Sequence, residues 1–295
     1  MKNIKLTIFT PTYNREKQLS KCYESLLEQT SKNFVWQVID DGSTDETEKF
    51  INKMKADEMI DIIYIKKENG GKVSAINLSL ERCSTELWVC LDSDDFLTNN
   101  AVEIILKNYE KIKYDEKVCG LIALRSNPDF TPMHKLSIPR GIKYATLRKI
   151  RYELGIPPEY VFAYKTNIIS QYPYPIIKGE KFMALSYVFD QIDQKYKYLV
   201  MHEPLMVCEY FEDGISKNKR KLIKKNPKGY TIYKRQALEL SPNLKLRIKE
   251  CILYITGCIL SNDKNCINNS PYKFLTILCY PLGWLLYMNM YRKNN

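Results

Sequence analysis

Cysteine pairs, histidines and glycine-rich loops are scarce in this 295-residue sequence. Its nine cysteines form no Cys-x-x-Cys pair and only two histidines are present, so we expect neither a disulfide framework nor a zinc site. With 11 Gly and 13 Pro, the composition excludes collagen-like and low-complexity chains. Because 45% of the residues are hydrophobic and 27% charged, we expect a folded chain with a sizeable core.

Several functional signals are also missing. The first residues are charged and soon reach Pro11, without the apolar segment of an export signal, so we expect a protein of the reducing cytosol. Residues 11–14 do not fit the GxGxxG motif of dinucleotide-binding enzymes, and residues 66–73 do not fit the GxxxxGK[ST] motif of P-loop proteins. No zinc finger or RNA-binding aromatic signature occurs, so nucleic acid is not an expected partner.

Charge is distributed unevenly along the chain, whose formal net charge is +11. Residues 1–120 contain 17 Lys and Arg against 21 Asp and Glu, which leaves 28 against 13 in residues 121–295. The densest basic run extends from Lys217 to Lys228. A basic second half faces phosphates or an anionic membrane in many proteins, although a charge run can also be a plain solvated surface.

Short β-rich runs alternate with segments of helical period along the first 124 residues. This order predicts an α/β fold with a mostly parallel central sheet flanked by helices. The expected strands are 6–10, 34–39, 62–65, 87–91 and 118–124, with helices over 16–29, 45–55, 72–82 and 100–113. Farther along, strands are expected over 161–166, 198–202 and 205–209, with a helix over 183–194.

Polar residues follow each of the first four expected strands. In open sheets of this kind ligands bind outside the carboxyl ends of the strands, so these segments are expected to form one crevice. Each segment has a simpler explanation, such as a turn, a helix cap or a surface lysine, but their convergence favours a site. The segments are residues 10–15, 40–45, 68–72 and 92–95.

Asp92 and Asp94 have the spacing of a metal-binding pair. In an extended chain, positions i and i+2 point the same way, so both carboxylates could reach one cation. Oxygen ligands favour a hard ion, Mg²⁺ or Mn²⁺, which keeps water and substrate phosphate oxygens in its other positions. The alternative is an acidic loop end without a ligand.

Together these segments closely resemble the family 2 glycosyltransferases, which have the GT-A fold. The resemblance is carried by Phe9–Arg15, Asp40–Asp45, Asn69–Lys72 and Leu91–Asp95, and it is looser from about residue 125 to residue 216. In that later stretch, residues 179–182 and 209–214 look like segments of bacterial surface-polysaccharide members. The fold class implied is the GT-A nucleotide-diphospho-sugar transferase fold with a helical C-terminal extension.

The resemblance implies roles in donor binding. Tyr13 would stack on the nucleotide base, Asp41 would accept a hydrogen bond from it, and Asp40 and Arg15 would support the pocket. Lys72 would lie near the sugar nucleotide, and the DxD pair would bind Mn²⁺ or Mg²⁺, with Asp94 the more direct ligand. Thr10, Pro11 and Ser93 complete the donor-binding set.

The catalytic base is the point at which this sequence departs from the family. Many relatives have a proline and a glutamate after a Gly-Glu-Lys-Phe segment, whereas Ala184 and Leu185 stand here. The family inverts configuration, so a carboxylate must deprotonate the acceptor hydroxyl. Asp190 or Glu180 could do so, and we favour Asp190.

The resemblance divides the chain into a GT-A domain, 1–216, and a basic helical region, 217–295. Within the domain, 1–125 would bind the nucleotide sugar and 126–216 the acceptor. The apolar run 251–260 is too short to span a bilayer. Residues 274–290, interrupted by Pro281 and Gly283, are expected to lie in a membrane interface, with a buried core helix as the alternative.

Two functions remain open at this stage. The first is a metal-dependent inverting transferase, peripheral on the inner face of the cell membrane, that moves one sugar from a nucleotide donor, UDP-linked by expectation. Its acceptor would be a lipid-linked saccharide, on a polyprenyl diphosphate, or another glycan of a surface polysaccharide. The second is a catalytically impaired GT-A domain that binds nucleotide or glycan within an assembly complex.

Overall fold

The chain divides into two compact units. The computed structural model describes residues 4–133, 135–208 and 219–292. One unit is formed by Met1–Pro173 and Gln191–Tyr210, and the other by Tyr174–Asp190 and Phe211–Asn295. The expected division at residue 216 thus differs from the observed one, because the segment from Tyr174 packs with the C-terminal helices.

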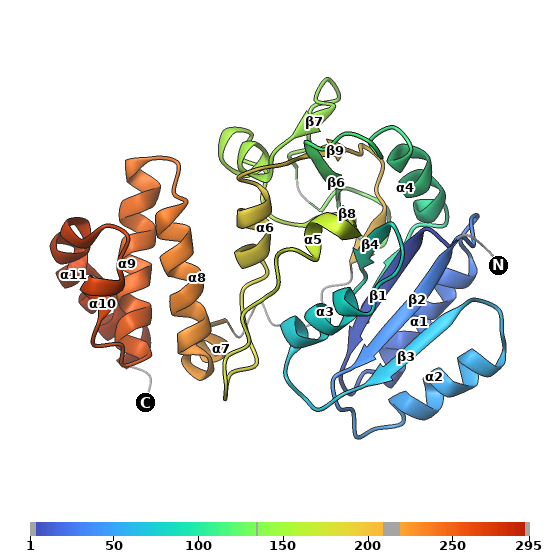
Figure 1. The fold of residues 1–295 in the computed structure, drawn as a ribbon, viewed down its shortest axis with the longest axis horizontal. Helices are drawn as coiled ribbons and strands as arrows, with labels where there is room; N and C mark the ends of the chain where they lie inside the picture. Colours follow the sequence, from blue (N-terminus) through green and yellow to red (C-terminus); the bar gives the residue numbers. More distant parts are fainter. Residues whose placement is uncertain (1–3, 134, 209–218, 293–295) are drawn as a thin grey trace. The chain divides into compact units, whose positions relative to one another are not determined.

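An eight-stranded mixed sheet forms the centre of the first unit, in the order β3-β2-β1-β4-β8-β6-β9-β7 (Figure 1). The first four strands are parallel to one another; β8 runs antiparallel to both β4 and β6, and β7 runs antiparallel to β9. The expectation of a mostly parallel sheet therefore holds, since only β7 and β8 run the other way. The strands are β1 (Leu6–Thr12), β2 (Phe34–Asp40), β3 (Ile62–Lys66), β4 (Leu87–Cys90), β6 (Val118–Leu124), β7 (Tyr144–Ala145), β8 (Tyr160–Lys165) and β9 (Lys197–Val200).

Helices cover both faces of this sheet because its strands are apolar on both sides. Leu6 and Ile8 of β1 join a core cluster that also contains the inner faces of α1 and α4. Phe9 points to the opposite face, where its ring stacks on Trp88 at 5.4 Å and α3 packs against β1 and β2 (Figure 1). The helices of this unit are α1 (Glu16–Leu27), α2 (Thr47–Ala56), α3 (Lys72–Glu81), α4 (Ala101–Tyr109), α5 (Thr166–Ile169) and the π-helix η1 (Lys149–Glu153).

The first strand is two residues longer than the sequence suggests. It continues to Thr12, and Pro11 pairs with Ile39 in the parallel ladder to β2. Proline is tolerated there because the ladder to β4 has already stopped at Phe9, so the missing N–H faces a side with no strand left to pair. The first loop therefore begins at Tyr13.

A second, two-stranded sheet joins β5 (Asp95–Leu97) to β10 (Met206–Cys208) in antiparallel order. Cys208 is the register partner of Asp95, so the end of β10 lies beside the acidic segment that follows β4. Glu209 and the 209–214 motif, which contributed to the family resemblance, lie outside the described residues, as does Lys217 of the basic run.

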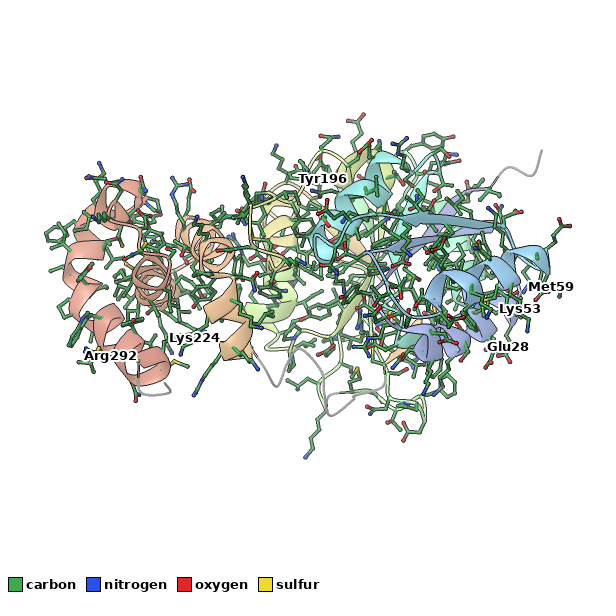
Figure 2. The ribbon with its side chains drawn as sticks, turned by 90° about the horizontal axis from the view of Figure 1, so that it is seen from below. Glu28, Lys53, Met59, Tyr196, Lys224 and Arg292 are labelled. Carbon is green, nitrogen blue, oxygen red and sulfur yellow. The ribbon has the colours of Figure 1, made fainter. Side chains whose placement is uncertain are left out.

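Three long helices make the core of the second unit. Helix α9 packs against both α8 and α11. Gly283 permits the close approach of α11, because a Cβ atom there would lie 2.5 Å from Ile255 Cγ2. The helices are α6 (Ser186–Ile192), α7 (Lys219–Lys225), α8 (Pro227–Glu239), α9 (Leu244–Leu260), α10 (Cys266–Asn269), α11 (Lys273–Tyr287) and the π-helix η2 (Met288–Arg292). Figure 2 marks Lys224 of α7 and Arg292 of η2 among the cations of this unit.

Two expectations about this unit need correction. The helix expected over 183–194 is the shorter α6, which begins at Ser186. Pro281 does not interrupt the apolar C-terminal segment, because α11 runs through it. An internal proline costs a helix about 3 kcal/mol, yet α11 continues through Pro281, with Cys279 and Gly283 buried on both sides of it and α9 packed against the helix. Among the described residues, only Lys273–Arg292 is long and apolar enough to cross a membrane, by length and composition.

Candidate active site

The loops after β1 and β2 are tied to each other around Asp40. This buried carboxylate accepts hydrogen bonds from the backbone N–H of Ser43 (2.7 Å) and the hydroxyl of Tyr64 (2.6 Å). The Ser43 hydroxyl accepts from the backbone N–H of Asn14 (2.9 Å), and the Asn14 side-chain oxygen accepts from the backbone N–H of Thr44 (2.8 Å). Asp40 therefore fixes the shapes of the loops after β1 and β2.

Asp41 organises the glycine turn that precedes α3. Its two carboxylate oxygens accept from the backbone N–H groups of Gly70 (2.9 Å) and Gly71 (2.7 Å) and from the Nζ of Lys67 (2.7 Å). Gly71 has φ of +86°, a conformation that favours glycine. Lys67 also donates to the Ser74 hydroxyl at 2.9 Å. Asp41 is only 8% exposed, so its carboxylate is largely committed to this turn.

Lys72, the first residue of α3, forms an ion pair with Asp92 after β4. The distance between Lys72 Nζ and Asp92 Oδ1 is 2.5 Å. Burial opposes the charge on both groups, but their mutual attraction outweighs it, so the pKa of Lys72 is raised and that of Asp92 is lowered. The Arg125 guanidinium also helps to lower the pKa of Asp92. The pair remains accessible, since 33% of the Lys72 side chain and 26% of the Asp92 side chain are exposed.

Asp95 lies deeper, beside Arg125 and Cys208. The Arg125 guanidinium donates to Asp95 Oδ2 (3.0 Å) and to the Cys208 sulfur (3.1 Å). Burial, reinforced by the charges of Asp92 and Asp94, raises the pKa of Asp95 to about 7 although Arg125 opposes the shift. This cluster anchors the acidic segment to β6 and β10.

The geometry of the DxD pair differs from our expectation. Asp92 and Asp94 do not lie in an extended segment, because the Asp95 N–H donates to the Asp92 carbonyl (3.0 Å) and closes a turn. The alternation argument for their common direction therefore does not apply. Asp94 is partly exposed within this turn, next to the buried Ser93.

The remaining expected donor-site residues lie around the first loop. Tyr13 is 48% exposed, as a ring available for stacking must be. Arg15 precedes α1 at the N-cap position, and Pro11 is partly exposed at the end of β1. Thr10 is fully buried and its hydroxyl accepts from the Trp36 indole N–H (2.9 Å), so its side chain serves the core.

The two candidate bases belong to the second unit and have different surroundings. Both carboxylate oxygens of Glu180 accept backbone N–H groups at the start of α8, from Lys228 (2.9 Å) and Gly229 (2.7 Å). Glu180 is thus a helix cap. Asp190 lies on α6 and is partly buried.

Sequence analysis assigned no role to three residues that hold this site together, namely Asn14, Lys67 and Arg125. Lys67 lies in the loop after β3 and Arg125 directly follows β6, and these positions were the only signals that could have drawn attention to them. Asn14 lies in the turn between β1 and α1 with φ of +52°, a backbone conformation that asparagine adopts more readily than most residues.

Solved structures define the class of the fold. S. aureus TarS 1–349 superposes with a TM-score of 0.58 and 16% identity over 99% of this chain and 92% of that chain. A mannosyltransferase from Pyrobaculum calidifontis superposes with a TM-score of 0.58 and 14% identity over 98% of this chain and 88% of that chain. At such identities the likeness concerns the fold, which is that of the GT-A glycosyltransferases.

The family follows from the sequence match. The family model described as glycosyl transferase family 2 matches residues 7–172, more than half of the chain. The chain belongs to this family, as its motifs indicated.

Curated relatives match over shorter segments. An uncharacterized glycosyltransferase of Rickettsia bellii is 37% identical over 111 residues, 38% of this chain and 16% of that protein. The teichoic acid poly(glycerol phosphate) polymerase of Staphylococcus epidermidis is 31% identical over 150 residues, 50% of this chain and 19% of that protein. The matched segments cover less than a fifth of these relatives.

Proposed function

We propose that this protein transfers a single sugar from a nucleotide-diphosphate donor, UDP-linked, to a glycan acceptor with inversion of configuration. The observation that carries the proposal is the meeting of four loops at the carboxyl ends of β1 to β4, where an exposed ring, a cation and carboxylates come together. It is supported by the S. aureus TarS structures in complex with UDP and with UDP-GlcNAc. The acceptor would be a lipid-linked saccharide or another glycan; the matched relatives include a teichoic acid poly(glycerol phosphate) polymerase and a chondroitin synthase.

The donor site would use the first unit's residues in two ways. The exposed Tyr13 ring would stack on the base. The Lys72 ammonium, which is paired with Asp92 in this structure, would pair with the donor diphosphate instead. Asp40 and Asp41 would act as positioning residues, because their oxygens are committed to Ser43, Tyr64, Lys67 and the glycine turn. Such preorganised loops lower the cost of binding, since little remains to be ordered when the donor arrives.

A divalent cation, Mn²⁺ or Mg²⁺, would stabilise the charge that develops on the departing diphosphate. The residues present suit such an ion, because Asp94 and Asp92 offer only oxygen ligands. Among the described residues, no group of three or more His, Cys, Asp or Glu side chains could hold a metal by itself. Two aspartates suffice when substrate phosphate oxygens supply the remaining metal ligands. The mannosyltransferase from P. calidifontis was solved with GDP-Man and Mn²⁺.

On the acceptor side, Asp190 would take the proton of the attacking hydroxyl. Glu180 is the less suitable carboxylate because both of its oxygens are engaged at the start of α8. Loss of a base would leave a domain that binds nucleotide without transferring sugar, which is the second candidate function.

A donor screen tests the proposal. We expect one UDP-sugar from a panel of UDP-, GDP- and CMP-sugars to raise the melting temperature with Mn²⁺ and to be hydrolysed slowly without acceptor. EDTA and the free sugar serve as controls. Stabilisation without hydrolysis or transfer to any acceptor would support the binding-only function, and the absence of stabilisation by every nucleotide sugar would refute both.

We propose that the protein binds its acceptor at the membrane surface. One face of α11 is packed into the helical core through Thr276, Cys279 and Gly283. The other face is apolar and exposed. We propose that this exposed apolar face is buried at the boundary between headgroups and acyl chains, as the apolar faces of interfacial helices are. Its exposed side chains are Phe274, Ile277, Leu278, Tyr280, Leu282, Trp284 and Leu285.

We expect the triple variant Phe274→Gln, Leu278→Gln, Leu285→Gln to bind anionic vesicles at least about tenfold more weakly than the unchanged protein. Each burial of a large apolar side chain contributes roughly 1.5–3 kcal/mol, and these three are 74%, 60% and 63% exposed, so the fold should persist. Cosedimentation with phosphatidylglycerol vesicles measures the effect. The control is Met59→Gln, Tyr114→Gln, Leu136→Gln, which removes exposed apolar residues from the first unit. Equal binding by both triple variants would exclude α11 as the contact.

A further inference from the structure

The helical unit contains a cavity that the proposed transfer chemistry does not use. It has a volume of about 650 Å³, opens to solvent and is lined by side chains of α7, α8, α9, α11 and η2, all within the same unit. Ligand pockets for small molecules commonly measure about 300–1,000 Å³. The cavity is therefore of a size that a small molecule could fill.

Its walls are apolar. Ile223, Leu253, Leu286 and Met290 line it together with the rings of Tyr230 and Tyr291. Two polar side chains of the wall have partners within the unit: the Thr256 hydroxyl donates to backbone carbonyls of α9 and α11, and Lys234 is paired with Glu250 at 2.7 Å. The interior thus offers a surface suited to a hydrocarbon chain.

Its rim is basic. Lys219, Arg220 and Lys221 are three consecutive exposed cations of α7 that border the cavity. Within the part of the chain that the structure describes, no acidic side chain lines the cavity or forms an ion pair with these three. Adjacent ammonium and guanidinium groups with several donors are suited to phosphate oxygens. An apolar interior below such a rim matches a molecule with a phosphate at one end and a hydrocarbon chain at the other.

We infer that this cavity binds an anionic amphiphile, with a phosphate group against Lys219, Arg220 and Lys221 and the first part of its hydrocarbon chain against Leu253 and Leu286. The inference rests on the proposed function, since it gives a lipid-linked acceptor its carrier site. The cavity also adjoins the apolar face of α11, because Leu286 lines it while the neighbouring Leu285 is 63% exposed. A chain too long for the cavity can continue along that face into a membrane.

The test measures binding of dodecyl phosphate to the full chain by calorimetry below its micellar concentration, without a nucleotide sugar. We expect one site per chain, and binding at least about tenfold weaker for dodecyl maltoside, which has the same hydrocarbon chain and an uncharged head. Arg220→Gln with Lys221→Gln should weaken dodecyl phosphate binding by about tenfold or more. Leu253→Trp, which fills the cavity, should do the same. The matched control, Lys245→Gln with Lys264→Gln, removes two exposed cations of this unit that do not line the cavity and should leave affinity within about twofold.

Three outcomes would overturn the inference. Inorganic phosphate that binds as tightly as dodecyl phosphate would indicate a free-phosphate site. Equal binding of dodecyl maltoside would indicate an apolar cavity with no headgroup recognition. If the rim variant and its control lose affinity for dodecyl phosphate equally, the phosphate group binds at another place. Because no donor is present, failure here is distinguishable from failure of the donor screen: a chain that hydrolyses a UDP-sugar but ignores dodecyl phosphate keeps the proposed transfer and loses this site.

Discussion

Asp94→Asn is expected to reduce sugar transfer by about 10²- to 10³-fold while leaving the melting temperature nearly unchanged. The amide keeps the shape of the side chain and removes the charge that would hold a divalent ion beside the diphosphate, and loss of one preorganised electrostatic partner has effects of this size. Stability should persist because Asp94 is partly exposed in the turn after β4. Transfer rates across a Mn²⁺ series, with thermal melting of each protein, measure both effects.

A matched control for this result is Asp45→Asn, which removes one carboxylate from the loop after β2. That side chain accepts from the backbone N–H of Thr47 at 3.1 Å and so has a local, structural role. Normal turnover by Asp94→Asn at every Mn²⁺ concentration would remove Asp94 from the metal site. Equal loss of turnover in both variants would point to a general effect of charge.

The alternation of strands and helices made the first half of the fold predictable. Each strand from β1 to β4 is apolar on both faces and each is followed by polar residues, a pattern that only a covered parallel sheet explains. The family motifs then pointed to the same four loops. The antiparallel insertion of β8 between β4 and β6 was not predictable, because local sequence does not encode strand order.

Side-chain partners were harder to predict than positions. The partners of Asp41 within the chain, Lys67 and the glycine turn, lie 26 to 30 residues away and were not predicted. The DxD alternation argument failed because one backbone hydrogen bond, from Asp95 to Asp92, turns the segment. Contacts of this kind depend on how loops from different strands meet, which no periodicity records.

The packing of residues 174–190 shows the same limit. The family resemblance placed Glu180 in the acceptor half of a domain ending at 216, but its carboxylate caps α8. Asn226 completes the link by accepting from the backbone N–H groups of Lys181 (2.8 Å) and Phe182 (3.1 Å). These contacts explain why the segment belongs to the helical unit.

The second large effect is expected at Asp190. Asp190→Asn should slow transfer to the acceptor by about 10²- to 10⁴-fold, the usual contribution of a positioned proton acceptor, because the amide cannot take the proton of the attacking hydroxyl. Donor affinity should remain nearly unchanged, since the residues proposed for the nucleotide lie in the loops after β1 to β4. Initial rates at saturating donor, with donor affinity measured separately by calorimetry, distinguish the two effects.

Glu180→Gln is the matched control, because it makes the same chemical change six residues from α6. Glutamine keeps one acceptor oxygen for the start of α8 but loses the second oxygen and the charge, so the free energy of unfolding should fall by about 1 kcal/mol, with little change in the rate of transfer by the folded protein. If Glu180→Gln transfers no sugar while Asp190→Asn remains active, Glu180 is the base and Asp190 is not. The hydrogen bonds between Glu180 and the start of α8 would then have to open during catalysis. Full activity of both variants would place the base on another residue, and the match of this region to the family would then have to shift.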